Sequence, residues 1–221
     1  MPDRKRAREL AAEFNRRGDP TGWFEVLYQE AEAGKSVVPW ADLRTNRQLL
    51  TFWEKHPQDT GGKLALVVGC GLGDDAEQLS AWGYRTTAFD ISETGIRAAR
   101  RRYPDSAVEY LVSDVLNPPA SFLRKFDFVF EAHTLQVLPG GLRAKAMERI
   151  ASFVRSGGLL LVIARGRRLT DPEGEMPWPL TREELSAFTT AGLRELSFEE
   201  IPDPDEAGVF RFRILYRFPD G

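Results

Sequence analysis

The chain has few of the features that would assign it to a membrane, a disulfide-stabilised fold or a zinc site. It has one cysteine in 221 residues, which excludes an internal disulfide and favours a reducing cytoplasm. This cysteine and the two histidines lie far apart in sequence, which argues against a zinc site. No uninterrupted apolar run approaches the roughly 20 residues of a membrane-spanning helix. We therefore expect a cytoplasmic protein without a metal and without a membrane partner.

The chain also lacks a surplus of basic residues. It has 30 Lys and Arg against 33 Asp and Glu, a formal net charge of -3, which disfavours nucleic acid as a partner. Hydrophobic residues make up 42% and aromatic residues 11% of the chain, enough for a sizeable core. The length suits one α/β domain with a small appendage.

Strand-like and helical patterns alternate from residue 64 onward. The expected strands are 64–68, 85–90, 108–112, 126–130 and 159–164, and the expected helices are 75–82, 93–102, 121–124, 142–154 and 182–191. Such alternation predicts a parallel sheet with right-handed crossovers. The last strand-like runs, 193–201 and 209–218, have no helix between them, so they should form an antiparallel hairpin at the sheet edge. The predicted fold is a doubly wound, mostly parallel, seven-stranded Rossmann-like α/β sheet.

Three helical patterns precede this alternation. They cover 4–17, the segment from Trp23 to Ala31, and 43–53. We therefore divide the chain into a helical region, 1–60, and one compact domain, 61–221.

A glycine-rich turn follows the first expected strand. It reads Gly69-Cys70-Gly71-Leu72-Gly73, and the next expected strand ends in Asp90. The order strand, glycine turn, helix, strand, acid is typical of sites for adenosine-containing cofactors. Gly69 and Gly71 allow the backbone to approach a ligand closely. Cys70 is interpreted as a small buried residue, not a nucleophile.

Two acidic residues after the turn favour S-adenosylmethionine over a dinucleotide. A dinucleotide sets its pyrophosphate against the start of the helix, where Asp74 and Asp75 would repel it. S-adenosylmethionine has no phosphate. The alternative is that both aspartates merely cap the helix.

The ends of the next two strands provide further polar groups. Asp90 can accept hydrogen bonds from both ribose hydroxyls, with Ile91 beside it, although it could also be an acid at a helix start. Asp114 can accept from the adenine amino group while the Val115 amide meets a ring nitrogen, although aspartate is also common where a loop begins.

These segments resemble class I S-adenosylmethionine-dependent methyltransferases, through residues 67–75, the acid at the strand end and the Ser113-Asp114 step. Trp23 and Tyr28, the run Val38-Pro39-Trp40-Ala41-Asp42 and segment 126–139 are similar to the thiopurine and thiol-halide methyltransferase group. The resemblance implies that 1–60 is a helical lid and 61–221 the S-adenosylmethionine-binding domain. The chain departs from this group at Glu131-Ala132-His133, which leaves the substrate open.

The resemblance places the lid over the cofactor. The rings of Trp23 and Trp40 are candidates to stabilise the sulfonium, although both could be packing anchors. Glu131, at the end of the fourth expected strand, is a further candidate for binding the cofactor.

The loops after the fourth and fifth expected strands are candidates for the acceptor side. His133 could act as a general base, or could only hydrogen-bond within its loop. A base is optional for a thiol, whose ordinary pKa is about 8.5. The other candidate substrate contacts are Thr134, Gln136, Arg165 and Trp178, and the basic part of this set could instead be a solvated loop.

The sequence therefore predicts transfer of a methyl group from S-adenosylmethionine to a small molecule, with a thiol or other soft nucleophile as the leading acceptor. We expect a monomer or a weak homodimer. Two alternatives stay open, a non-catalytic cofactor-binding or partner-regulating module and a Rossmann oxidoreductase.

Overall fold

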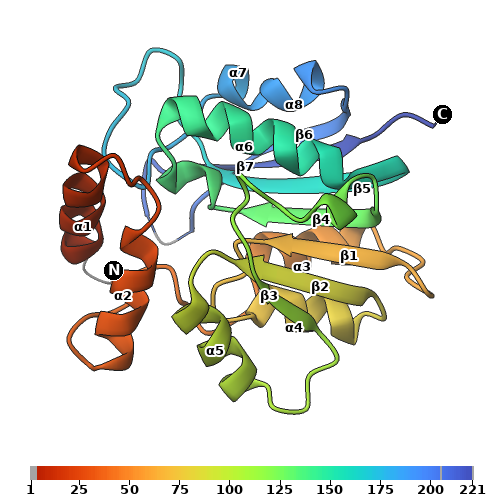
Figure 1. Ribbon diagram of the computed structural model, residues 1–221. Helices are drawn as coiled ribbons and strands as arrows, with labels where there is room; N and C mark the ends of the chain where they lie inside the picture. The colour runs from red at the N-terminus through yellow and green to blue at the C-terminus, as the bar shows by residue number, and fades with distance from the viewer. Residues whose placement is uncertain (1–3, 205, 221) are drawn as a thin grey trace. The chain divides into compact units, whose positions relative to one another are not determined.

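The computed structural model describes residues 4–204 and 206–220, and its strands form one seven-stranded sheet (Figure 1). The strand order is β3-β2-β1-β4-β5-β7-β6. Strands β1 to β5 pair in parallel where their register is defined, and β7 pairs antiparallel with both β5 and β6. The predicted mostly parallel sheet with an antiparallel hairpin at its end is confirmed. Residue contacts group the chain into two compact units.

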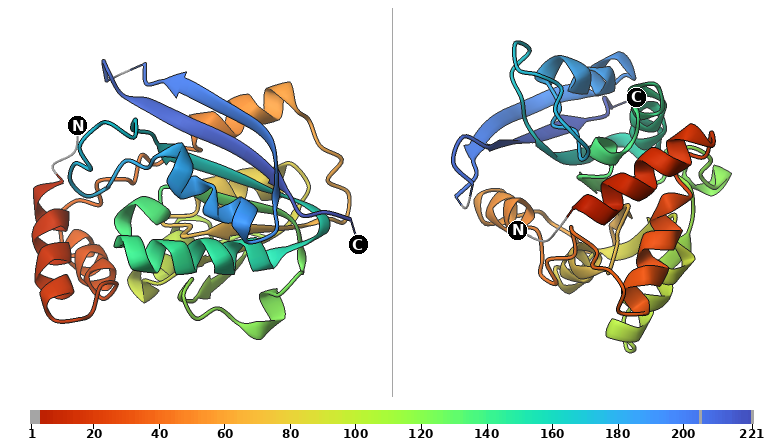
Figure 2. Two further views of the ribbon diagram at one scale, coloured as in Figure 1. Left: turned by 90° about the horizontal axis from the view of Figure 1, so that it is seen from above. Right: turned by 90° about the vertical axis from the view of Figure 1, so that its left-hand side faces the viewer.

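The first unit comprises residues 1–61 and 69–114. Its helices and strands are α1 (Lys5–Arg16), α2 (Trp23–Glu32), α3 (Arg47–Lys55), α4 (Asp74–Ala81), β2 (Arg85–Asp90), α5 (Glu93–Arg102) and β3 (Glu109–Val112). Helices α1 and α2 pack against each other, and α2 also contacts α5 (Figures 1 and 2). Helix α1 buries one apolar stripe, with Ala7, Leu10 and Ala11 inward.

The second unit comprises residues 62–68 and 115–221. Its strands are β1 (Leu64–Val68), β4 (Phe126–Ala132), β5 (Val154–Arg165), β6 (Arg194–Pro202) and β7 (Phe210–Arg217). Its helices are the 3-10 turns η1 (Ala120–Phe122) and η2 (Leu135–Val137), and α6 (Gly140–Phe153), α7 (Arg182–Leu185) and α8 (Ala187–Thr190). Helix α6 packs against β4, β5 and α8, and the long β6–β7 hairpin is visible in Figure 2.

Strand β4 lies at the centre of the second unit. It pairs with β1 on one side and β5 on the other, so that Glu131 lies opposite both Val68 and Val162. Four consecutive residues at the end of β1 are buried, the near-continuous burial expected of a strand covered on both faces. Residues 128–131 of β4 are buried as well, Glu131 among them.

Several boundaries differ from the sequence-based expectation. Helix α3 begins at Arg47, not at 43, because Leu43 has a left-handed φ of 54° and Asn46 caps the helix by accepting from the Gln48 amide at 2.8 Å. Strand β5 begins five residues earlier than expected, since Val154 pairs with Phe126 ahead of a register shift in the ladder. The helix expected over 182–191 is two one-turn helices, and the one expected over 121–124 is a 3-10 turn.

Candidate functional site

The glycine turn after β1 has the geometry that its sequence predicts. Gly69, Gly71 and Gly73 all have positive φ, at 60°, 53° and 94°. A Cβ atom on Gly73 would lie 2.4 Å from the Tyr110 hydroxyl, and one on Gly71 would lie 3.3 Å from the Tyr28 hydroxyl. The turn therefore combines a backbone conformation that favours glycine with neighbours that leave little room for a side chain.

Asp90 lies at the end of β2 and is 7% exposed. Its Oδ2 accepts from the Gly71 amide at 3.0 Å, and its Oδ1 accepts from the Ser92 amide at 3.0 Å. Burial raises the pKa of this carboxyl group, and the backbone amides lower it in part. Since each carboxylate oxygen has two lone pairs, both oxygens can still accept from a ligand hydroxyl. Asp90 therefore connects the glycine turn to the β2 end instead of serving only as a helix-start acid, and Ser92 is the N-cap of α5.

Asp114 follows the end of the neighbouring strand β3 and is the other residue of the first unit that is a candidate for binding a nucleoside. The Ser113 amide donates to the Asp90 carbonyl oxygen at 3.0 Å, so the step to Asp114 follows directly beside Asp90. Asp114 and Ile91 are both half-buried. Val115 is 7% exposed and belongs to the second unit.

Asp74 and Asp75 do not cap α4 with their side chains, because Gly73 is the N-cap and no side-chain cap is present there. Asp74 forms an ion pair with Arg102, with N–O distances of 2.8 and 2.9 Å. Asp75 accepts from the Asn46 amide at 2.7 Å, and burial raises its pKa to about 6. Arg102 offsets the Asp74 charge, so the expected repulsion of a pyrophosphate is weaker than the sequence alone indicated.

An aromatic cluster from the N-terminal helical region lies next to the glycine turn. Trp23 is fully buried, stacks on Phe24 with ring centroids 3.9 Å apart, and donates to the Pro20 carbonyl oxygen at 3.1 Å. Trp40 donates to the Tyr28 hydroxyl at 3.2 Å. These contacts favour packing for Trp23 and leave the half-buried Trp40 as the better candidate for facing a ligand.

Glu25 fastens α2 to the start of α5. Its carboxylate accepts from the Ser92 hydroxyl at 2.6 Å, the Thr94 hydroxyl at 2.6 Å and the Thr94 amide at 3.1 Å. A negative charge at a helix N-terminus is stabilising because the exposed N–H groups point toward it. This contact holds α2, which carries Tyr28, against the start of α5 within the first unit.

In the second unit, Glu131 is fully buried on the central strand β4. Its Oε1 accepts from the Leu135 amide at 3.1 Å, and among the described residues its Oε2 has no hydrogen-bond partner. Burial raises the pKa of this carboxyl group to about 7. A buried carboxyl oxygen without a donor is costly and fits a ligand that brings a cation or a hydroxyl.

The loop after β4 brings His133, Gln136, Arg165 and Trp178 together. His133 Nδ1 lies 2.9 Å from Gln136 Oε1, which also accepts from the Arg165 amide at 2.8 Å. The Gln136 side-chain amide donates to the Trp178 carbonyl oxygen at 3.1 Å, and the Trp178 amide donates to the Gln136 carbonyl oxygen at 2.7 Å. Gln136 is 1% exposed. All these contacts are to the protein, so they support a positioning role for Gln136 instead of the expected contact with substrate.

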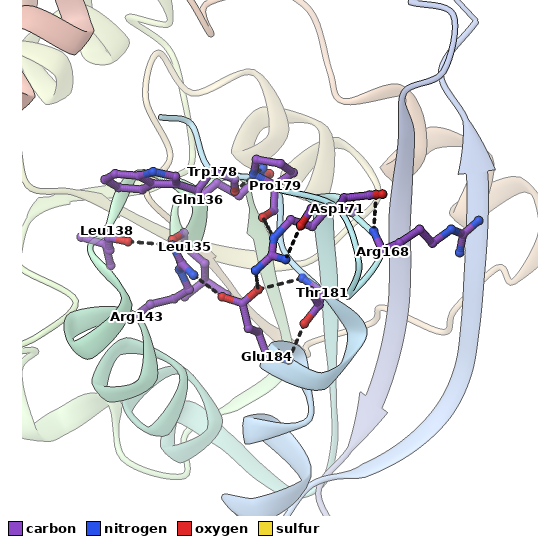
Figure 3. Close-up of polar contacts among 11 residues, drawn as sticks. Leu135, Gln136, Leu138, Arg143, Arg168, Asp171, Trp178, Pro179, Thr181 and Glu184 are labelled. Atoms are coloured by element: carbon purple, nitrogen blue, oxygen red, sulfur yellow. Dashed lines mark hydrogen bonds and ion pairs between the residues drawn. The ribbon is translucent and has the colours of Figure 1, made fainter. Parts of the chain in front are cut away.

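Buried charges support this loop from the α6 side (Figure 3). Arg143, 3% exposed, donates to the carbonyl oxygens of Leu135 at 3.1 Å and Leu138 at 3.2 Å, and forms an ion pair with Glu184. Glu184 also accepts from Arg167 at 3.2 Å. Three-residue 3-10 turns are weak by themselves, and the contacts of Arg143 with two of the carbonyl oxygens here support η2.

The other acceptor-side candidates are partly used within the protein. The Thr134 hydroxyl donates to the Val68 carbonyl oxygen at 3.3 Å. The guanidinium group of Arg165 forms an ion pair with Glu206 at 3.2 Å, and that of Arg168 with Glu200 at 2.5 Å. The basic residues after β5 are thus paired with acids, which supports neither a free anion clamp nor a loop of unpaired charges.

Sequence reasoning missed Glu25 and Arg143, and it assigned Tyr28 only to a helix and a family signature. Glu25 and Arg143 lie in ordinary helical patterns, and their partners are 69 and 41 residues away. Neither carried a local signal. Tyr28 could have been identified from its place in the aromatic run that precedes Trp40.

Comparison with known proteins supports the predicted similarity to methyltransferases. Residues 65–158 match the family profile described as a methyltransferase domain. No curated protein matches the chain in sequence.

The fold is shared with several solved structures. One comes from work on the conversion of a disulfide bond into a thioacetal group during echinomycin biosynthesis (TM-score 0.71, 18% identity, 89% of this chain and 92% of the other covered). Another is Burkholderia thailandensis 1,6-didemethyltoxoflavin-N1-methyltransferase (0.69, 18%, 96% and 91%). A third is the magnesium protoporphyrin IX methyltransferase of Synechocystis PCC 6803 with bound S-adenosylmethionine (0.61, 14%, 77% and 76%).

A methyltransferase domain matched over residues 65–158, and a fold shared with solved S-adenosylmethionine-dependent methyltransferases, agree with the class of enzyme that the sequence predicted. In the part of the chain that the structure describes, none of the helices has the length and hydrophobicity to cross a membrane.

Proposed function

We propose that this methyltransferase acts on a small molecule whose acceptor atom is a thiol sulfur or another soft nucleophile. The observation that carries the cofactor part of the proposal is Asp90, held by the Gly71 and Ser92 amides at the end of β2. When bound, S-adenosylmethionine supplies a methyl group on a sulfonium, and the bonding electrons stay with the cofactor's sulfur. The protein must bind this group, align an acceptor with it and exclude water.

Residues of the first unit are assigned to the nucleoside. Asp90 accepts from the ribose hydroxyls, with Ile91 beside it, and Asp114 accepts from the adenine amino group. Gly69, Cys70 and Gly71 provide the close backbone approach. Burial and the nearby Asp90 raise the pKa of the Cys70 thiol well above its usual value, which supports a packing role for Cys70. The ring of Trp40 is the candidate neighbour of the sulfonium, while Trp23 supports it by packing.

The second unit contains further candidate residues. Val115 offers a backbone amide for the adenine ring. Glu131 offers its Oε2 to a cationic or hydroxyl group of the cofactor, which fits the lack of a donor to this atom among the described residues. On the acceptor side we assign His133, Thr134 and Trp178 to substrate contact, and Arg165 to the loop that holds them.

Three considerations support a thiol acceptor. The segments around Trp40 and after β4 resemble thiopurine and thiol-halide methyltransferases, and a thiol requires little assistance to ionise near neutral pH. The structural neighbour from echinomycin biosynthesis is described in connection with sulfur chemistry. The toxoflavin neighbour is named as an N1-methyltransferase, so nitrogen acceptors belong in the same test.

Isothermal titration calorimetry with S-adenosylhomocysteine tests the cofactor assignment. We expect wild type to bind and Asp90→Ala to lose about 1.5–3 kcal/mol, roughly 10–150-fold in Kd, because a charged hydrogen-bond acceptor is removed. Asp220→Ala is the matched control, since Asp220 is an exposed carboxylate that pairs with Arg217. Thermal unfolding of each variant verifies that it is folded. Equal affinity of wild type and Asp90→Ala contradicts the ribose assignment.

An acceptor panel tests the substrate class. Thiols, halide ions, phenols and amines are incubated with S-adenosylmethionine, and S-adenosylhomocysteine is quantified. The proposal expects the highest kcat/KM among thiols. Turnover of amines or phenols alone overturns it. Cofactor binding without turnover of any acceptor favours the non-catalytic module, and retention of NADH in preference to S-adenosylhomocysteine favours the oxidoreductase.

A further inference from the structure

The orientation of the Gln136 side-chain amide is fixed by two backbone groups. Its Oε1 lies 2.8 Å from the Arg165 nitrogen, which can only donate, and its Nε2 lies 3.1 Å from the Trp178 carbonyl oxygen, which can only accept. Rotating the amide by 180° would place two donors face to face and two acceptors face to face. The positions of oxygen and nitrogen are therefore determined by the hydrogen-bond network.

This orientation determines which nitrogen of His133 carries the proton in neutral imidazole. Nδ1 lies 2.9 Å from Gln136 Oε1, and an amide oxygen only accepts. Nδ1 must then be the protonated nitrogen, and Nε2 is the nitrogen that carries the lone pair. A partner that donates to Nε2 is compatible with the same tautomer.

The backbone around His133 is held as firmly as its ring. His133 has a φ of 67°, an uncommon left-handed conformation for a residue other than glycine, and its amide donates to the Ile163 carbonyl oxygen at 3.1 Å. Gln136, on η2, is held in turn because Arg143 binds the carbonyl oxygens on both sides of it, those of Leu135 and Leu138 (Figure 3).

We propose that Gln136 is a positioning residue that fixes the Nδ1–H tautomer of His133, so that Nε2 accepts the proton that the acceptor loses when it is methylated. The inference rests on the proposed function. The acceptor atom gives up a proton as it gains the methyl group, and the neutral imidazole becomes imidazolium. Nδ1–H continues to donate to Gln136 Oε1 throughout, so that no second proton moves. The class of acceptor is one that carries a removable proton, a thiol or a hydroxyl, and not a halide ion.

Nitrogen-15 NMR measures the tautomer directly. The chain has two histidines, so in His56→Gln only His133 contributes imidazole signals. At about pH 8.5, where an ordinary imidazole is neutral, we expect a protonated, pyrrole-type Nδ1 and a pyridine-type Nε2. A protonated Nε2 overturns the proposal. The measurement needs no cofactor or acceptor, so its failure is distinct from that of the proposed function, which calorimetry with S-adenosylhomocysteine tests.

Substitutions of Gln136 in the same His56→Gln background separate tautomer control from general packing. Gln136→Glu keeps an oxygen for Nδ1 and for the Arg165 amide, and we expect it to keep the tautomer. Gln136→Met fills a similar volume without an acceptor, and we expect the Nε2–H form to appear. With the preferred acceptor, Gln136→Met should lower kcat by about 10²-fold with little change in KM, and Gln136→Glu should restore most of it. An unchanged tautomer or an unchanged kcat in a folded Gln136→Met protein overturns the proposal.

Discussion

Ionisation of the buried carboxyl group of Glu131 should make the stability of the protein depend on pH. Its pKa is raised from an ordinary value of 4.5 to about 7 because the group is fully buried, and the backbone amides of Leu135 and Thr134 offset this only in part. A raised carboxyl pKa contributes stability that is fully present below about pH 4.5 and is lost as the pH rises through about 7. At alkaline pH, ionisation of the buried Glu131 therefore lowers the free energy of unfolding of wild type, and Glu131→Gln has no such loss.

The size of this effect follows from the shift. A difference between 4.5 and about 7 is about 2.5 pKa units, and at 1.36 kcal/mol per unit this corresponds to about 3 kcal/mol. At pH 5 the neutral carboxylic acid and the amide of Glu131→Gln have similar polarity, so the two proteins should have similar stability. Above about pH 8, the variant should be more stable by about 2–3 kcal/mol, since the amide does not ionise.

Urea unfolding from pH 5 to pH 8.5, without cofactor, measures this difference. Subtracting the free energy of unfolding of wild type from that of the variant removes the contributions of other titrating groups, including Asp75 and Asp90. Glu148→Gln, at an exposed position of α6, is the matched control and should not reproduce the trend. A difference between Glu131→Gln and wild type that does not change with pH refutes the reasoning, because it would mean that Glu131 ionises as easily in the folded protein as in the unfolded chain.

Two further substitutions test the first unit. Gly73→Ala should destabilise the protein by about 1–3 kcal/mol in urea unfolding, since Gly73 has a φ of 94° and the new Cβ would lie 2.4 Å from the Tyr110 hydroxyl. Tyr110→Phe in the same chain should recover only part of this loss, and wild-type stability for Gly73→Ala alone would contradict the geometry of the turn. Glu25→Ala should increase hydrogen exchange of the α2 amides by about 10-fold, because α2 loses its contacts with Ser92 and Thr94. Unchanged exchange in α2 would show that Glu25 does not fasten the helix.

Local patterns predicted the fold because each element carries its own signal. The apolar run of β1, the glycines that follow it and the acid that ends β2 are contiguous in sequence, and each has a direct physical requirement behind it. Asp90 was predicted to end the second strand, and it does, whereas its contact with the ribose hydroxyls stays a prediction. Boundaries were less accurate, because the Asn46 cap and the pairing of Val154 with Phe126 depend on contacts that periodicity does not report.

The roles of individual polar residues could not be predicted in the same way. Asp74 was interpreted from its place at a helix start, but Arg102, 28 residues later, offsets its charge. Gln136 was assigned to the substrate because it follows β4, yet its partners Arg165 and Trp178 come from other segments and occupy its polar atoms.

The amino-acid sequence by itself determined the order of strands and helices and the glycine turn, because these depend on residue type and on spacing over a few residues. Only the tertiary structure decided which charges are neutralised, which buried carboxyl oxygen has no donor among the described residues and which histidine nitrogen carries a proton. Those properties depend on distances between atoms from separate segments, and electrostatic and hydrogen-bond energies change steeply with such distances and with burial.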